Sequence, residues 1–273
     1  MKRLMYLFLL TALCLSCTRQ PVQLTILHTN DTHSQVEPKA DGKGGYSRRM
    51  GYIQQERETD PDLIYVDAGD FWQGTPYFNF FNGRVEIEAL NRMGCDAATL
   101  GNHEFDNGVD TMAAVLRLAQ FPIVCCNYKV EGSPLEDIVK PFTIIRRKGL
   151  KIGIVGVGCN PESIIAAHNF APLEYQSPLP VADEVAKMLK QRKHCDLVIC
   201  LSHLGTEVSH GDEDGVCDRW LAENSRYIDL IIGGHTHQVV ENLQVLNLDG
   251  QPVTLRQTGK SGVNIGKIVV TVE

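Results

Sequence analysis

The stretch that decides the fold is His28-Thr29-Asn30-Asp31-Thr32-His33-Ser34, which reads HTNDTHS and follows the apolar run 24–27. A short apolar run of this kind is typical of a buried strand. Side chains two positions apart in an extended segment point to the same side, so Asp31 and His33 can converge on one point. The pair could hold a metal ion, or it could belong to a polar turn. This stretch alone favours the turn, because Asp, Asn, Ser and Thr are common where strands end.

Short apolar segments alternate with segments of helical periodicity along the chain. Strands are predicted at 22–28, 63–67, 96–100, 122–126, 152–158, 196–201 and 228–232, and helices at 46–58, 83–93, 108–120, 181–193 and 213–225. Two hairpin-like stretches, 141–158 and 243–271, add antiparallel strands. This alternation predicts an α/β domain with mixed sheets.

The first residues have the pattern of an export signal. Lys2 and Arg3 precede an apolar run, 4–15, that is too short to span a bilayer. We therefore predict a secretory signal over 1–16 and a single domain over 17–273, because no linker divides the mature chain. Ser16-Cys17 resembles a bacterial lipoprotein signal with a lipid anchor on Cys17, and simple secretion is the alternative. The protein is expected in the periplasm or cell envelope.

Charge and cysteine usage exclude two kinds of site. The formal net charge is −7 without a long basic run, which argues against a nucleic-acid surface. Seven cysteines follow Cys17, without regular spacing and without a C-x-x-C pair. This pattern is neither a disulfide framework nor a thiolate zinc site, and it predicts buried thiols that pack as small hydrophobic groups.

Polar residues collect directly after five of the predicted strands. In open α/β sheets the carboxyl ends of the strands form the edge where ligands bind. The residues brought to this edge are Asp31, His33, Asp70, Asn102, His203, His235 and His237. Imidazole nitrogens mixed with carboxylate and amide oxygens suit Zn, Mn, Fe or Co better than a Ca or Mg cage. Seven ligands are too many for one tetrahedral ion and fit two divalent transition metal ions.

The ordered series NDTH, AGD, LGNHEFD, LSH and GGHTH resembles the calcineurin-like metallophosphoesterases. The segments ILHTND, GDFWQGTP and GNHEFDNG are most similar to the catalytic domain of the bacterial 5′-nucleotidase branch. This resemblance extends from about residue 22 to the end of the sequence. The resemblance implies a four-layer α-β-β-α sandwich with two mixed β-sheets. It also implies two ion sites that share a bridging Asp70: one with Asp31, His33 and His237, the other with Asn102, His203 and His235.

The same resemblance pairs His103 with Asp106 as the catalytic residues. A carboxylate on one ring nitrogen fixes the tautomer and stabilises an imidazolium, which could then protonate a leaving alkoxide. The alternatives are a supporting role for His103 without proton transfer and helix N-capping by Asp106. Glu104 is expected in a salt bridge or facing solvent. His28 and Asn30 are expected to be core or supporting residues and not ligands.

The function implied is that of an exported two-metal phosphohydrolase. It would cleave phosphomonoesters, in particular nucleotides, as 5′-nucleotidases do, by attack of a metal-activated hydroxide with His103 and Asp106 assisting. The alternatives are a cyclic-nucleotide phosphodiesterase or a nucleotide-sugar pyrophosphatase. From a different class, an inactive binding lipoprotein of the same fold is the alternative, against which the intact motif set speaks.

The resembled 5′-nucleotidases carry a second, C-terminal domain whose aromatic residues stack on the base. Here the sequence ends at Glu273, after a predicted last strand. We therefore expect base recognition from the loops 71–82 and 159–180, from a separate polypeptide carrying the missing C-terminal nucleotide-binding domain, or not at all. The isolated chain is expected to prefer no particular base. The expected substrate is a small phosphoester or nucleotide, with no nucleic-acid partner and with membrane contact only through Cys17.

Overall fold

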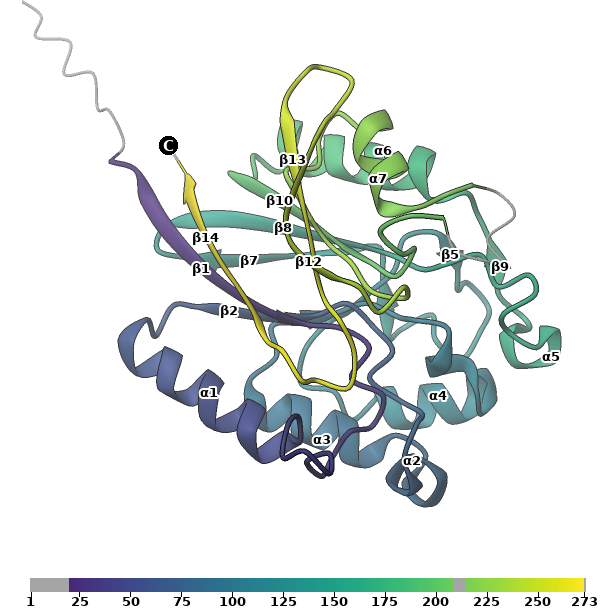
Figure 1. Ribbon diagram of the computed structural model, residues 1–273. Helices are drawn as coiled ribbons and strands as arrows, with labels where there is room; N and C mark the ends of the chain where they lie inside the picture. Colours follow the sequence, from purple (N-terminus) through teal and green to yellow (C-terminus); the bar gives the residue numbers. More distant parts are fainter. Residues whose placement is uncertain (1–19, 209–214, 273) are drawn as a thin grey trace, which may run out of the picture.

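The computed structural model describes residues 20–208 and 215–272. It has four layers, with helices on the outside and two sheets face to face between them (Figure 1). The predicted α-β-β-α sandwich with two mixed β-sheets is confirmed. The predicted signal and Cys17 lie outside the described residues.

The first sheet has the strand order β14-β1-β2-β3-β4-β6. Only β14 (Gly266–Val272) is antiparallel, and it pairs with β1 (Val22–Thr29). The parallel strands that follow are β2 (Ile64–Asp67), β3 (Ala97–Ala98), β4 (Ile123–Val124) and β6 (Val139–Lys140).

The second sheet has the order β12-β13-β11-β10-β8-β7. Its centre is parallel and consists of β13 (Pro252–Thr258), β11 (Leu230–Ile232), β10 (Leu197–Ser202) and β8 (Leu150–Val157). The outer strands, β12 (Val239–Leu246) and β7 (Phe142–Arg147), are antiparallel to their neighbours. A separate ribbon pairs β5 (Tyr128–Lys129) with β9 (Glu174–Tyr175).

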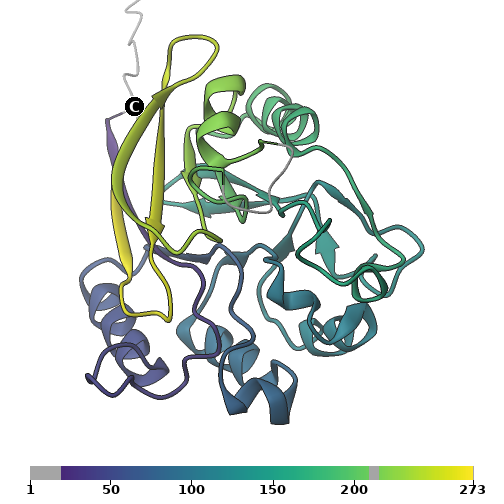
Figure 2. The same cartoon turned by 45° about the vertical axis from the view of Figure 1, so that its right-hand side comes forward.

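The helices cover the outer face of each sheet. The first sheet is covered by α1 (Tyr46–Thr59), α3 (Arg84–Met93) and α4 (Gly108–Leu116), and the second by α6 (Pro178–Gln191) and α7 (Asp218–Asn224) (Figure 1). Shorter turns lie in the connections: α2 (Pro76–Phe81), η1 (His103–Phe105) and α5 (Ala167–Phe170). Figure 2 shows these connections gathered at one end of the sandwich.

The layer between the sheets explains why the inner strands are apolar on both faces. Side chains from β1, β2, β8, β10 and β11 meet there and are fully buried, among them Leu24, Ile26, Val66, Ile154 and Ile199. A second apolar cluster lies between the first sheet and its helices, and a third lies between the second sheet and its helices. Strands covered on both faces need continuous apolar runs, which is the pattern that the sequence shows.

Three predicted elements differ in the structure. The helix predicted over 213–225 is α7, which begins only at Asp218, because Gly215 has a φ of 70° and Cys217 is extended. In 243–271, β12 and β13 form the predicted hairpin, but β14 leaves it and pairs with β1 in the other sheet. The reason is packing, since Ile268 and Val270 of β14 contribute to the layer between the sheets. The helix predicted over 108–120 also ends early, at Leu116.

The seven cysteines of the described residues are all buried, which confirms the prediction of buried thiols. Burial raises the pKa of thiols such as Cys125 and Cys200. Within residues 20–208 and 215–272, no helix has both the length and the apolar character needed to cross a bilayer.

Gly266 provides a test of the β1–β14 pairing. It lies opposite the buried His28, and a Cβ at this position would lie 1.9 Å from His28 Nε2. We expect Gly266→Ala to lower the free energy of unfolding by about 1–3 kcal/mol, as overpacking does, measured by chemical denaturation. Gly51→Ala is the control, because among the described residues nothing lies within 4 Å of a Cβ there. A Gly266→Ala protein as stable as its parent would contradict the pairing.

Candidate metal centre

The loops after β1, β2, β3, β10 and β11 meet at one end of the sandwich. Three of these strands belong to the first sheet and two to the second. The loops are joined across the sheets: the His203 ring nitrogen Nδ1 lies 2.7 Å from the Ala68 carbonyl oxygen, and the His235 backbone N–H donates to the Asp31 carboxylate at 3.0 Å. Parallel strands therefore bring the predicted residues to a common place, as expected.

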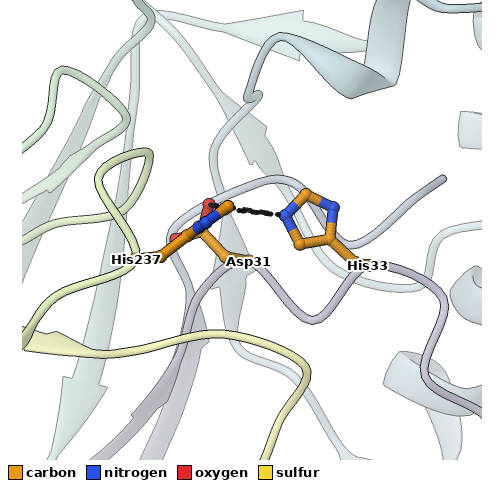
Figure 3. Close-up of side chains that lie close together, drawn as sticks. All are labelled: Asp31, His33 and His237. Carbon is orange, nitrogen blue, oxygen red and sulfur yellow. Dashed lines mark hydrogen bonds and ion pairs between the residues drawn. The ribbon is translucent and has the colours of Figure 1, made fainter. Parts of the chain in front are cut away.

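One group of predicted ligands consists of Asp31, His33 and His237, whose side chains face one another (Figure 3). His237 Nε2 lies 2.9 Å from His33 Nε2 and 3.4 Å from Asp31 Oδ1, and His33 Nε2 lies 3.9 Å from the same oxygen. A tetrahedral ion with bonds of about 2.0–2.1 Å holds its ligand atoms roughly 3.3 Å apart. The spacing of these atoms therefore fits a metal ion.

A second group joins Asp31 and Asp70 to His203. His203 Nε2 lies 3.2 Å from Asp70 Oδ2, and His33 Nε2 lies 4.0 Å from the same oxygen. Asp70 thus lies between the two groups, where a bridging ligand is predicted. His203 is fully buried, and its Nε2 has no hydrogen-bond partner in the part of the chain that the structure describes. An orphaned nitrogen beside two carboxylates fits a metal ligand, and its Nδ1 contact with Ala68 orients the ring.

Asn102 and His235 form a pair at the edge of this cluster. His235 Nδ1 lies 3.1 Å from Asn102 Oδ1, and the His235 ring centre lies 5.4 Å from that of His203. The structure therefore brings all seven predicted ligands to one place. The division of the ligands between two ions remains a prediction.

The backbone at five of the seven predicted ligands is left-handed, which is rare for residues other than glycine. The φ angles are 47° at Asp31, 45° at His33, 54° at Asp70, 73° at His235 and 55° at His237. Hydrogen bonds between loops hold this conformation, since Asp31 N–H donates to Gly69 and His33 N–H donates to Asp70, at 2.9 and 3.0 Å. Such strain is concentrated at functional sites.

Opposite charges shift the protonation equilibria inside the cluster. Burial lowers the pKa of His203, but the charge of Asp70 and the contact with it outweigh burial and raise it. Burial raises the pKa of Asp70, and the neighbouring histidines outweigh burial and lower it. Burial lowers the pKa of His33. The carboxylate charge that raises the pKa of His203 also favours a metal cation, and metal binding would release the proton from His203.

His103 lies beside the cluster, on η1. Its backbone N–H donates to Asp70 Oδ1 at 2.8 Å, and its ring Nδ1 lies 2.9 Å from Asp106 Oδ2. Burial lowers the pKa of His103, but the contact with Asp106 and the charge of Asp70 raise it to about 8. The helix that follows is preceded by Asn107, and the Asp106 carboxylate contacts His103. Asp106 therefore orients His103 and is not an N-cap.

The expectation for Glu104 is wrong. Glu104 is fully buried, and its carboxylate accepts backbone N–H groups from Asp70, Trp72 and Gly101 at 2.9, 3.2 and 2.6 Å. Burial and the charge of Asp70 raise its pKa to about 8. Glu104 fastens the loop after β2 to the loop after β3. No local pattern in the sequence indicates this role, because it depends on contacts between distant segments.

The expectation that His28 and Asn30 are core or supporting residues is confirmed. His28 and Asn30 are buried, and Asn30 supports the site by donating to Asp31 Oδ2 and to the Gly259 carbonyl. In the loop 71–82, Phe71 and Trp72 pack in the core. The same loop exposes an aromatic side chain that the sequence analysis did not single out, Phe80, which is 79% exposed.

The fold and the centre together define a metal-dependent phosphoesterase of the α-β-β-α sandwich class. Residues 24–239 match the calcineurin-like phosphoesterase family, and the chain belongs to this family.

Similar proteins include several nucleotidases. A snake venom 5′-nucleotidase of Gloydius brevicauda is 33% identical over 237 residues, covering 82% of this chain and 38% of the relative. The 5′-nucleotidase precursor of Thermus thermophilus has a TM-score of 0.82 and 27% identity, covering 92% of this chain and 52% of that one. The NAD nucleotidase of Haemophilus influenzae has a TM-score of 0.80 and 26% identity, covering 92% and 47%. The chain thus spans about two-fifths to one-half of the length of these proteins.

The place of Asp70 between the two groups makes its substitution the sharpest test of the centre. We expect Asp70→Asn to lower the bound metal measured by mass spectrometry and to lower turnover about 100-fold or more, because a weaker ligand would affect both ions. Asp110→Asn, an exposed change on α4, is the matched control. Near-normal turnover with two metals still bound to Asp70→Asn would refute the bridging assignment.

Proposed function

We propose that this chain is an exported two-metal phosphohydrolase that cleaves phosphomonoesters, with nucleotides as the substrate class. The single observation that carries the proposal is the cluster of Asp31, His33, Asp70, His203 and His237 beside the His103–Asp106 pair. Export and a lipid anchor on Cys17 are part of the proposal and rest on the sequence of the first 17 residues.

The residues of the chain have separate tasks in this reaction. Asp31, His33, Asp70 and His237 would hold one ion, and Asp70, Asn102, His203 and His235 would hold the other. When bound, the ions neutralise phosphoryl oxygens and lower the pKa of an attacking water. His103, protonated below about pH 8, donates its Nε2 proton to the leaving oxygen while Asp106 holds Nδ1. Glu104 holds the loops of Asp70 and Asn102 together, because its carboxylate accepts backbone N–H groups from both loops.

The metal ligands do not select the leaving group of the substrate. The ions they hold would act on the phosphoryl group, which all candidate substrates have in common. Similarity to 5′-nucleotidases supports nucleoside monophosphates. Similarity to an NAD nucleotidase supports the second candidate, cleavage of a pyrophosphate bond such as that in nucleotide sugars. A separate polypeptide with a nucleotide-binding domain remains our proposal for how base selectivity would arise.

A phosphoester screen tests the function. The purified mature chain, supplied in turn with Zn, Mn, Fe or Co, should hydrolyse p-nitrophenyl phosphate and nucleoside monophosphates, and a strong chelator should abolish turnover. A cyclic nucleotide and a nucleotide sugar complete the panel and test the alternatives. Binding of these compounds without turnover under any of the metals would instead support an inactive binding protein.

The contact between His103 and Asp106 predicts a pH effect. The raised pKa of His103 means that its acid form is lost as the pH rises through about 8, so turnover should fall on the alkaline side. Asp106→Asn removes the charge that raises this pKa, and we expect the alkaline limb of the kcat profile to move to lower pH. Asp110→Asn should leave the limb in place. An unmoved limb in Asp106→Asn would remove the general-acid role.

A further inference from the structure

A cavity outside the metal centre lies between the start of α1 and the loop 259–265 that joins β13 to β14. We call it the arginine cavity, after Arg48 and Arg49 in its wall. Its volume is about 350 Å³, and Tyr52, Gly262 and Asn264 also line it. Among the described residues that form the wall, two are cationic and none is acidic. Its electrostatic character therefore favours an anion.

Arg49 is the strongest sign of a ligand here. The side chain is only 2% exposed, and its Nη2 donates to the Gln35 carbonyl at 3.2 Å. Its Nε and Nη1 have no hydrogen-bond partner within the described residues. Below the guanidinium carbon, the Tyr46 ring centre lies 4.3 Å away. A buried cation with two unused N–H groups is unfavourable unless something compensates it.

The charges of two buried carboxyls, Asp67 and Glu86, act on the Tyr46 ring that lies against Arg49, and burial raises the pKa of both. Asp67 is fully buried, and burial raises its pKa to about 7 even though the charge of Arg49 opposes the shift. Around neutral pH, Asp67 is therefore only partly ionised. An anion in the arginine cavity would supply further negative charge to the Arg49 guanidinium, which lines the cavity.

The start of α1 adds to the positive potential of the cavity. The helix is 14 residues long, its N-cap is Gly45, no side chain of the described residues caps it, and its first turn carries no acidic residue. The first N–H groups of a helix carry a partial positive charge. Arg48, in the first turn, is exposed, and within 20–208 and 215–272 its one hydrogen bond goes to the carbonyl of Gly42, so its guanidinium has further donors for a ligand.

The walls of the arginine cavity are tied to the metal centre on both sides. In the loop 259–265, Ser261 N–H donates to the Asp31 carbonyl at 2.7 Å, and Asn30 Nδ2 donates to the Gly259 carbonyl at 2.8 Å. On the other side, Arg49 bonds to Gln35, two residues beyond His33. A ligand in this cavity would therefore contact two segments that both bond to the one loop carrying Asp31 and His33.

We propose that the arginine cavity binds a small oxyanion group, a phosphate or sulfate, through Arg49 and Arg48 at the start of α1. The site is separate from the metal centre and does not depend on the reaction proposed above. Its volume exceeds that of a single oxyanion and lies within the range of small-molecule sites, so the ligand is either the free ion or the phosphate group of a small organic molecule.

Calorimetric titration of the metal-loaded protein tests the proposal. The probes are sulfate, inorganic phosphate and phenylphosphonate, which has no ester bond to hydrolyse. We expect two sites for phosphate, only one of them competed by substrate. Tighter binding of phenylphosphonate than of phosphate at the uncompeted site would identify an organic phosphate as the ligand, and the reverse order would identify the free ion.

Charge reversal then locates the second site. Arg48→Glu should weaken the uncompeted site about tenfold or more, because charge-assisted hydrogen bonds are lost, and should leave the competed site unchanged. Arg92→Glu, an exposed change on α3, is the matched control and should change neither site. Arg49→Gln, checked for cooperative unfolding, should abolish the second site. A single oxyanion site, competed by substrate and equally strong in the parent protein and in Arg48→Glu, would overturn the proposal.

Discussion

The left-handed backbone at the predicted ligands is the constraint on which the centre depends. Each such residue costs of the order of 1–3 kcal/mol unless the surroundings enforce it. The enforcing contacts run between loops, as in the bond from Asp31 N–H to Gly69, and the loops themselves begin at strands buried on both faces. The rigid sheets thus stabilise a local conformation that the loop sequences would not adopt alone.

Glu104 and Asp70 show how closely ligand positions and the catalytic pair are connected. Glu104 fastens the loops after β2 and β3, and Asp70 accepts the backbone N–H of His103. The residue that is predicted to bridge two ions therefore also sets the position of the predicted proton donor. A change at Asp70 would alter metal binding and proton transfer together, so the two effects need separate measurements of metal content and of pH dependence.

The centre exists only where the two sheets meet. Asp31, Asp70 and Asn102 follow strands of the first sheet, whereas His203 and His235 follow strands of the second. Packing between the sheets consequently sets the ligand distances, and the edge strand β14 and the loop before it close this arrangement near Asp31. The arginine cavity is lined by the same loop, whose Ser261 N–H donates to the Asp31 carbonyl. An oxyanion bound in the cavity would therefore contact a segment that is hydrogen-bonded to a predicted metal ligand.

The residues by themselves predicted an α/β domain with mixed sheets and seven candidate ligands, because strand ends and short motifs are local features with fixed spacing. The α-β-β-α sandwich and the His103–Asp106 pair were implied by the resemblance to the calcineurin-like metallophosphoesterases. Only the tertiary structure decided which side chains meet across the sheets, such as His33 with His237. It also decided that β14 pairs with β1, that the buried Glu104 holds the loops after β2 and β3 together and that Arg49 is buried beside a cavity. These features depend on contacts between segments far apart in the chain, and local periodicity carries no information about such contacts.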